Sequence, residues 1–332
     1  MCVRRALLFI DAFIGASIGA LLLVATAHAQ TPERYPSRPV RMVIPYAAGG
    51  GPDVVARIIA DRLTPAWGQN MVFDNRGGGG GVIGAAIVAK AAPDGHTLLL
   101  HTAAYTSMPY FYKNLPYDPL RDLMPITLVA KNVGYVLLLN PRLPVKSVKD
   151  LIALAQATPG KLNFGSAGVG SVGHLAAELF LNAAKIKMTH VPYTGIPAMI
   201  TDIIGGQIDI GFPAAPSAMA LIQAGRVQVL GISGEKRWDK LPHVPTLDEA
   251  GVKGYKFISW YGLWFPAGTP AAYVQRVHND VAAAVKDPAV RKRLEEQGLD
   301  GIGSTPQELA RTVVEDMTLN KELTARIGIV PQ

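Results

Sequence analysis

Three glycine-rich turns carry the residues of this sequence that could do chemistry, and each is predicted to join a strand to a helix. The first is residues 45–53, Pro-Tyr-Ala-Ala-Gly-Gly-Gly-Pro-Asp, the second runs from Gly77 to Gly84, and the third is residues 164–174. Glycine lets a backbone bend and approach a ligand closely. A turn that opens a helix also presents free N–H groups at the positive end of the helix dipole. The chemistry that these turns predict is the binding of an anion.

Several polar side chains in these turns have a second interpretation. Asp53 could contact a ligand, but capping of its own helix is favoured. Ser166 or Ser171 could be a nucleophile with His174 as the base, which would make the protein a secreted serine hydrolase. Against this, the sequence is not G-x-S-x-G, Ser171 is a natural N-cap, and His174 lies one turn into the same helix. Packing or hydrogen bonding is favoured for His174, and the hydrolase remains an alternative hypothesis.

Cofactor and metal chemistry find little support. Residues 79–84 fit G-x-G-x-x-G, but five consecutive glycines make the match almost automatic, and no acidic residue ends a second strand at the required distance. No H-E-x-x-H motif occurs, and His96 and His101 are expected on opposite faces of a strand. We therefore predict no cofactor, no metal and no catalytic residues.

Composition places the chain among folded proteins. With 332 residues, 49% hydrophobic and 17% charged, it can bury a large core, and its length favours two domains. The net charge of +7 comes from 32 basic and 25 acidic residues, scattered without a run of five like charges. This pattern does not predict nucleic-acid binding and favours an anionic partner only weakly. We expect a monomer.

The first 29 residues are predicted to be a secretory signal peptide. Arg4 and Arg5 precede an uncharged apolar stretch at residues 12–27, and Ala27-His28-Ala29 is an A-x-A cleavage site. The stretch is short for a helix that spans a bilayer. Cleavage after Ala29 would remove the single cysteine, Cys2, so the exported chain would fold without disulfides. We expect the mature protein in the periplasm.

Short β-branched runs alternate with helical patterns along the remaining chain. Strands are expected at 40–45, 71–73, 97–101, 136–139, 161–164, 188–191, 208–210, 227–232 and 257–265, and helices at 55–63, 83–90, 148–157, 171–184, 196–204, 214–224 and within 269–327. This alternation is typical of α/β folds with parallel sheets. We predict two α/β lobes around a central cleft: residues 30–127 plus 233–332, and residues 128–232. Two crossing strands would let one lobe rotate against the other.

At these turns the sequence closely resembles the Bug (TctC-type) solute-binding receptors of tripartite tricarboxylate transporters. The likeness covers nearly all of the mature chain and includes residues 43–50 with Asp53, 75–84, 93–99, 165–170 with 174–175, 191–193 with Pro197, 205–209 with Phe212, 241–246 and 260–263 with 266–270. The resemblance implies a fold like that of type II periplasmic binding proteins. It further implies capture of a small carboxylate by Venus-flytrap closure and delivery to the membrane permease subunits of such a transporter.

The same resemblance implies which residues hold the ligand. By position these are Tyr46, Ala47, Gly50, Asp53, Thr102, Ser166, Gly170, Ser171, His174, Asp209 and Pro213. Tyr46 stands where phenylalanine is usual and adds a hydroxyl near the ligand, and Gly77 replaces a common proline. Citrate-like acids, dicarboxylates, acidic amino acids and aromatic carboxylates all remain open as ligands. A ligand-sensing partner of a signalling receptor is a further alternative.

Overall fold

The computed structural model describes residues 35–331. The predicted signal peptide, residues 1–29, and its cleavage site lie outside the described residues. Every strand and helix below belongs to one compact unit, Arg38–Gln332. In the described part of the chain, no helix combines the length and the apolar character needed to cross a membrane.

A six-stranded sheet has the strand order β11-β4-β10-β3-β1-β2. Its members are β1 (Val40–Ile44), β2 (Met71–Asn75), β3 (Thr97–Thr102), β4 (Leu123–Asn132), β10 (Trp260–Pro266) and β11 (Leu299–Gly301). β1 pairs in parallel with β2 and β3, as the alternating pattern predicts. β10 runs antiparallel to β3 and β4 because it brings the chain back from the second sheet, so this sheet is mixed.

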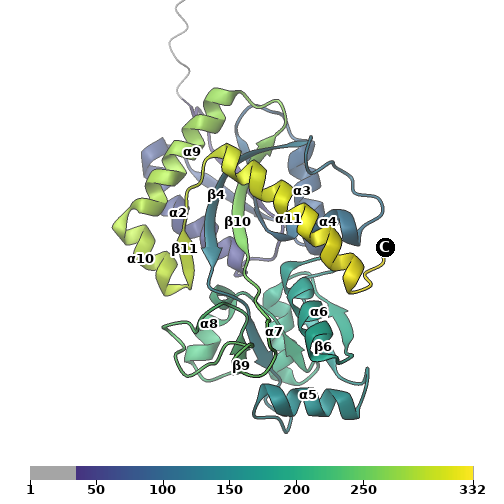
Figure 1. Ribbon diagram of the computed structural model, residues 1–332. Helices are drawn as coiled ribbons and strands as arrows, with labels where there is room; N and C mark the ends of the chain where they lie inside the picture. The colour runs from purple at the N-terminus through teal and green to yellow at the C-terminus, as the bar shows by residue number, and fades with distance from the viewer. Residues whose placement is uncertain (1–34, 332) are drawn as a thin grey trace, which may run out of the picture. The chain divides into compact units, whose positions relative to one another are not determined.

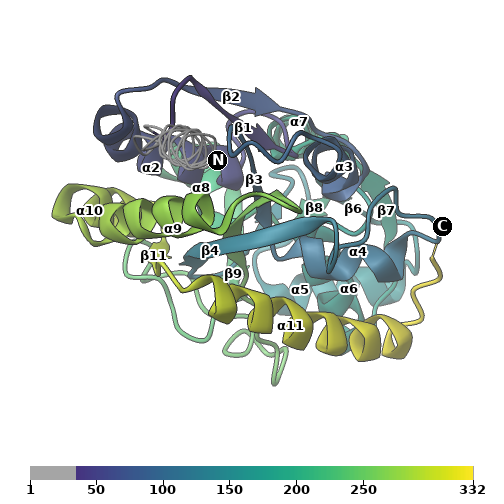
Figure 2. The same cartoon turned by 90° about the horizontal axis from the view of Figure 1, so that it is seen from above.

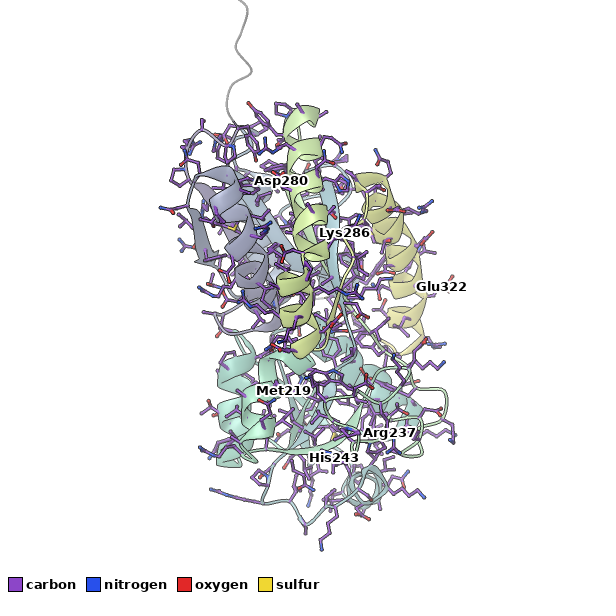
Figure 3. The ribbon with its side chains drawn as sticks, turned by 90° about the vertical axis from the view of Figure 1, so that its left-hand side faces the viewer. Met219, Arg237, His243, Asp280, Lys286 and Glu322 are labelled. Carbon is purple, nitrogen blue, oxygen red and sulfur yellow. The ribbon has the colours of Figure 1, made fainter. Side chains whose placement is uncertain are left out.

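Helices cover both faces of this sheet. They are α2 (Gly51–Trp67), a single 3-10 turn η1 (Gly79–Gly81), α3 (Val82–Ala89), α4 (Ala104–Phe111), α9 (Ala271–Lys286), α10 (Pro288–Glu296) and α11 (Pro306–Arg326). In Figure 2, α2 and α3 lie on one side of β4 and α11 lies on the other. Asp280 of α9, labelled in Figure 3, accepts a 2.7 Å hydrogen bond from the indole of Trp67 and so ties α9 to the end of α2.

A five-stranded sheet has the order β7-β6-β8-β5-β9 and lies with α5 to α8 in the lower part of Figure 1. Its strands are β5 (Val136–Leu139), β6 (Asn163–Ser166), β7 (Thr189–Pro192), β8 (Ile210–Gly211) and β9 (Gln228–Ile232), and the helices are α5 (Val148–Ala157), α6 (Val172–Ala184), α7 (Ile196–Gly205) and α8 (Ala215–Gln223). β6, β7 and β8 are parallel, whereas β5 runs against β8 and β9. Because β6, β7 and β8 are parallel, their carboxyl ends lie at the same edge of the sheet, and the turns that lead into α6, α7 and α8 begin there.

Helix α6 shows how the sequence positions one of these turns. Ser171 is its N-cap and accepts a hydrogen bond from the His174 N–H, which satisfies one of the free donors of the first turn. The apolar residues Leu175, Ala176 and Phe180 recur at helical spacing and are buried in the core beside β6. Burial of this face fixes the helix axis, so the start of α6 points along a defined direction.

The chain passes between the two sheets twice, from β4 to β5 and from β9 to β10. Asn132 and Ser259 join the two crossing segments, because the N–H of each donates at 2.9 Å to an oxygen of the other. Ser233 adds its hydroxyl, which accepts from the Tyr135 N–H at 2.7 Å. We call the elements of residues 38–132 and 259–331 the first lobe, and those of 133–258 the second lobe. The boundaries predicted near residues 127 and 232 remain a prediction; β4 itself continues to Asn132.

Candidate functional site

A cavity of about 40 Å³ lies where the two lobes meet. The first lobe contributes residues from the turn before α2 and from β3 and β10, and the second contributes the first turns of α6, α7 and α8. The full lining is Tyr46, Gly50, Gly51, Pro52, Thr102, Tyr135, Ala167, Ser171, Val172, Gly173, Ile196, Ala214, Ser217 and Tyr261. Four predicted site residues, Tyr46, Gly50, Thr102 and Ser171, are brought together here. Among the described residues that form this lining, none carries a charged side chain.

Four helix amino termini converge on this cavity. They belong to α2, whose N-cap is Gly50, to α6, whose N-cap is Ser171, to α7, which begins at Ile196, and to α8, whose N-cap is Ala214. Of the four N-cap residues, only Ser171 accepts a hydrogen bond with its side chain. In α2, α7 and α8 no side chain caps the N–H groups of the first turn. Each terminus is equivalent to about half a positive charge. The cavity is therefore electropositive without a lysine or arginine in its wall.

The hydroxyl of Tyr46 faces the protein at this cavity. It donates to the carbonyl of Gly80 at 2.8 Å and lies 3.1 Å from the hydroxyl of Thr102, which accepts from the Ala104 N–H at 3.2 Å. Burial raises the pKa of Tyr46 well above its usual range, so the hydroxyl keeps its proton. The extra oxygen noted at this position in the sequence thus holds the η1 turn against the cavity wall.

Two further hydroxyls of the cavity, which sequence reasoning did not select, have no such partner. Tyr261 Oη and Ser217 Oγ are buried, and no other described group forms a hydrogen bond with either of them. Burial raises the pKa of Tyr261 well above its usual range; the side-chain amide of Asn132 lies near enough to offset this in part, but its Nδ2 forms no hydrogen bond with Tyr261 Oη. Tyr261 is the one residue of β10 that carries a hydroxyl. Ser217 carries no signal beyond its place in the first turn of α8.

Ser166 and His174 form a second cluster, behind the cavity wall. Ser166 Oγ lies 2.7 Å from Nε2 of His190 and accepts from the Gly168 N–H at 3.2 Å. The ring of His174 stacks on that of His190 with centroids 3.9 Å apart, and its Nδ1 accepts from the Gly170 N–H at 3.0 Å. Ser166 and His174 thus brace the turn that opens α6. His190 escaped sequence analysis because the pairing of β6 with β7 sets its position.

The positions of Ser166, Ser171 and His174 do not support the hydrolase hypothesis. Nε2 of His174 faces Glu178 at 3.5 Å, and Ser171 is bonded to the backbone N–H of His174 and not to its ring. Within the described structure, neither ring nitrogen of His174 is hydrogen-bonded to Ser166 or Ser171. Burial, reinforced by His174, lowers the pKa of His190 to about 3. The described residues also contain no group of three or more His, Cys, Asp or Glu side chains that could hold a metal ion.

Asp53 is engaged by its own helix. Its carboxylate accepts from Arg57 Nε at 2.9 Å, from the Gly49 N–H at 3.0 Å and from the Asn75 amide at 3.3 Å. Burial opposes ionisation of Asp53, but the hydrogen bonds from Arg57 and Gly49 outweigh it and hold the pKa of Asp53 below its usual range. The side chain is absent from the cavity lining, so it shapes the turn before α2 from outside.

The other predicted residues are placed around the cavity or away from it. Ala47 lies against Gly195 of the second lobe, and the Gly170 carbonyl accepts from Ser107 of α4 at 3.1 Å. Pro213 adjoins the start of α8 and accepts from the Val136 N–H at 3.0 Å. Asp209 precedes β8 at the end of the sheet away from Ser166, and it accepts from the Asn163 N–H at 2.8 Å. Of these four residues, Asp209 is the one that the fold separates from the cavity.

Glycines on both lobes allow the cavity walls to meet. A Cβ at Gly80 would lie 2.1 Å from the carbonyl oxygen of Val169, and a Cβ at Gly195 would lie 2.5 Å from the Cβ of Ala47. Side chains cannot approach so closely, so at Gly80 backbone meets backbone, and at Gly195 the backbone meets the methyl group of Ala47. Tyr112 adds a hydrogen bond of 3.1 Å to the Val169 carbonyl. We call these contacts the glycine seam.

Known proteins match this chain over most of its length. Residues 55–329 match the TctC family, described as "Tripartite tricarboxylate transporter family receptor". A UPF0065 protein from the tcbD-tcbE intergenic region of Pseudomonas sp. strain P51 is 36% identical over 296 residues, which are 89% of this chain and 88% of the relative. A structure from R. palustris, solved with adipate, has a TM-score of 0.86 and 36% identity, and covers 90% of this chain and 100% of its own. MatC from Rhodopseudomonas palustris, with bound malate, has a TM-score of 0.83 and 30% identity, and covers 87% and 99%.

Proposed function

Since this chain belongs to the tripartite tricarboxylate transporter receptor family, we propose that it captures a small carboxylate in the cavity between its lobes and delivers it to the membrane permease of such a transporter. The observation that carries the proposal is the convergence of four helix amino termini on one cavity whose lining has no charged side chain. Backbone N–H groups at helix starts favour an anion. The malate and adipate held by two structural relatives are both carboxylates.

The available donors are sufficient for binding without an arginine. A hydrogen bond to a charged group contributes roughly 1.5–3 kcal/mol. Four to six N–H or O–H donors then give about 6–18 kcal/mol before the entropy and desolvation costs of binding. Micromolar affinity requires about 8 kcal/mol net. The helix termini can therefore bind a carboxylate with micromolar affinity, which suits both capture and release.

Ligand entry requires the lobes to separate. Backbone contacts across the glycine seam close the route between the lobes. These contacts support the proposal that the two lobes form a Venus flytrap in its closed form, with the hydrogen-bonded pair Asn132 and Ser259 at its hinge.

A thermal-shift screen tests the proposal. Purified mature protein is heated with malate, adipate, citrate, glutamate or benzoate, and in parallel with the corresponding neutral amides. A ligand at 100 times its dissociation constant stabilises the folded state by about 2.7 kcal/mol, which raises the melting temperature by several degrees. We expect at least one carboxylate, and none of the amides, to do so. Equal shifts with acid and amide would contradict anion capture by helix termini.

Export to the periplasm and delivery to a permease follow from the same assignment. Family members are periplasmic binding proteins, and a receptor needs membrane subunits to pass its ligand on. The receptor role differs from a hydrolytic one in that the captured carboxylate leaves unchanged. Uptake of a radiolabelled carboxylate by spheroplasts that carry the permease should depend on added protein, and the label should be recovered in the intact acid.

A further inference from the structure

Two unpartnered hydroxyls, one from each lobe, line the same cavity. Tyr261 is only 1% exposed, and neither its Oη nor the Oγ of Ser217 has a hydrogen-bond partner among the described residues. Both atoms lie beside the helix starts. A Cβ built on Gly51, in the first turn of α2, would be 2.6 Å from Tyr261 Oη and 3.6 Å from the Cβ of Ala214, the N-cap of α8.

Unpartnered buried hydroxyls are costly, and their position indicates what would satisfy them. A buried polar group without a partner destabilises a fold by about 1–3 kcal/mol. Among the described residues of the lining, Tyr46 Oη and Thr102 Oγ1 already bond to the protein, whereas Tyr261 Oη and Ser217 Oγ are buried without a hydrogen bond. The helix termini around them favour negative charge. A carboxylate in this cavity would offer oxygen acceptors to these O–H groups.

We propose that Tyr261 and Ser217 are specificity-determining ligand contacts, which donate hydrogen bonds from opposite lobes to the carboxylate oxygens of the bound acid. This inference rests on the proposed function and extends it from backbone donors to two named side chains. Because Tyr261 comes from β10 and Ser217 from α8, both bonds exist together only when the lobes are closed. The two hydroxyls thus stabilise the closed form when the ligand presents an oxygen acceptor to them.

Single-atom variants test the inference. Tyr261→Phe and Ser217→Ala each remove one hydroxyl and leave the rest of the side chain. The control is Tyr255→Phe, since Tyr255 is equally buried but its hydroxyl donates to the Ala176 carbonyl at 2.7 Å, outside the cavity. Calorimetric titration uses the acid from the screen that gives the largest shift with wild-type protein, with malate and adipate tested in every case. Melting temperatures are measured without and with the same acid.

The expected results differ in sign between the test variants and the control. Tyr261→Phe and Ser217→Ala should each weaken binding about 10- to 100-fold, the loss expected for a hydrogen bond to a charged group. Without ligand, both variants should melt at the wild-type temperature or above it, because each deletes an unsatisfied buried group. Tyr255→Phe should melt lower and bind as the wild type does.

The outcomes also separate this inference from the function beneath it. If wild-type protein binds a carboxylate and both variants bind it as tightly, the two hydroxyls do not contact the ligand and this inference is wrong while the proposed function stands. If no acid in the screen binds wild-type protein, the proposed function fails and this inference fails with it. If Tyr261→Phe does not fold, Ser217→Ala alone decides, since it changes a half-buried residue at a helix start.

Discussion

Adding one methyl group at Gly195 should hold the lobes apart. Gly195 precedes α7 in the second lobe, and its backbone is extended, with φ 179° and ψ 168°, so alanine meets no conformational strain there. Its Cβ would lie 2.5 Å from the Cβ of Ala47 in the first lobe. Real Cβ atoms keep at least 3.4 Å in ordinary contact. The two turns must therefore move apart by 3.4 − 2.5 = 0.9 Å, and only in the closed form.

The cost of this clash sets the expected loss of affinity. Forcing one additional methyl group into a packed contact typically costs about 1–3 kcal/mol. If the open form is unaffected, this cost falls on the closed form alone, and Gly195→Ala should weaken carboxylate binding by about 5- to 150-fold. The melting temperature of the ligand-free protein should change little. Scattering should show a smaller ligand-induced decrease in the radius of gyration.

A second substitution turns this into a rescue experiment. Ala47→Gly removes the clashing atom, after which the nearest remaining contacts, at 3.3 and 3.4 Å, are backbone atoms that small adjustments can accommodate. Affinity should return in the double variant Ala47→Gly/Gly195→Ala, as measured by titration with the same acid. Gly205→Ala, at the other end of α7, is the matched control because its Cβ would meet nothing nearer than 4.0 Å. Full affinity in Gly195→Ala, or no recovery in the double variant, would refute the reasoning.

Two predictions concern stability. Asp53→Asn breaks the ion pair with Arg57 and should lower the free energy of unfolding by roughly 1–3 kcal/mol, with a smaller effect on ligand affinity than Gly195→Ala; a denaturant titration beside a binding titration checks this, and the reverse ranking would make Asp53 a ligand contact. Burial lowers the pKa of His101 from 6.5 to about 4, so the unfolded chain binds the extra proton first and stability is lost as pH falls below 6.5. Between pH 6.5 and about 4.5 the loss should reach up to about 2.5 kcal/mol. His101→Gln should flatten this slope, whereas the exposed His243→Gln should leave it unchanged; equal slopes in all three proteins would show that His101 does not carry the effect.

Local patterns predicted the elements whose signals are complete within a short segment. The strand at 136–139 and the helix at 148–157 agree with β5 and α5 to the residue. Ser147 caps α5 by accepting from the Asp150 N–H, and β5 is a continuous buried apolar run. In both cases the start signal and the periodicity lie in neighbouring residues, so no distant contact is needed to interpret them.

Elements that depend on distant partners were missed. α4 contains Pro109, and β4 contains Pro125 and polar residues, so neither resembles a regular element in sequence. β4 is held between β10 and β11, which follow it by more than 120 residues, and irregular register with β10 accommodates its sequence. Tertiary pairing outweighs local propensity here. The expectation of parallel pairing was confirmed for β1 with β2 and β3 and for β6 with β7 and β8, and it was wrong for β5 and β10, whose directions depend on pairing with distant strands.

The residues of the candidate site also differ in whether local sequence patterns could predict them. Glycine-rich turns before helices can be recognised from sequence, and they supplied Tyr46, Gly50 and Ser171 to the cavity, whereas Thr102, at the end of β3, was predicted from the family resemblance. Tyr261 could not be found in this way. β10 is buried along its whole length, so no alternation of polar and apolar residues indicates which side chain faces the cavity.

The distribution of helix termini between the lobes determines how strongly a ligand can drive closure. In the open form an anion can interact with the amino termini of α6, α7 and α8, which all belong to the second lobe. The amino terminus of α2 and the hydroxyl of Tyr261 belong to the first lobe, so they reach the anion only when the lobes close. One terminus and one hydrogen bond to charge contribute roughly 2–5 kcal/mol together. A ligand can shift a conformational equilibrium only by its differential affinity, and about 5.5 kcal/mol is needed to take a population from 1:99 to 99:1. A carboxylate thus cannot close a protein that is almost wholly open without it. We therefore expect the ligand-free chain to visit the closed form to an appreciable extent, stabilised by the contacts of the glycine seam.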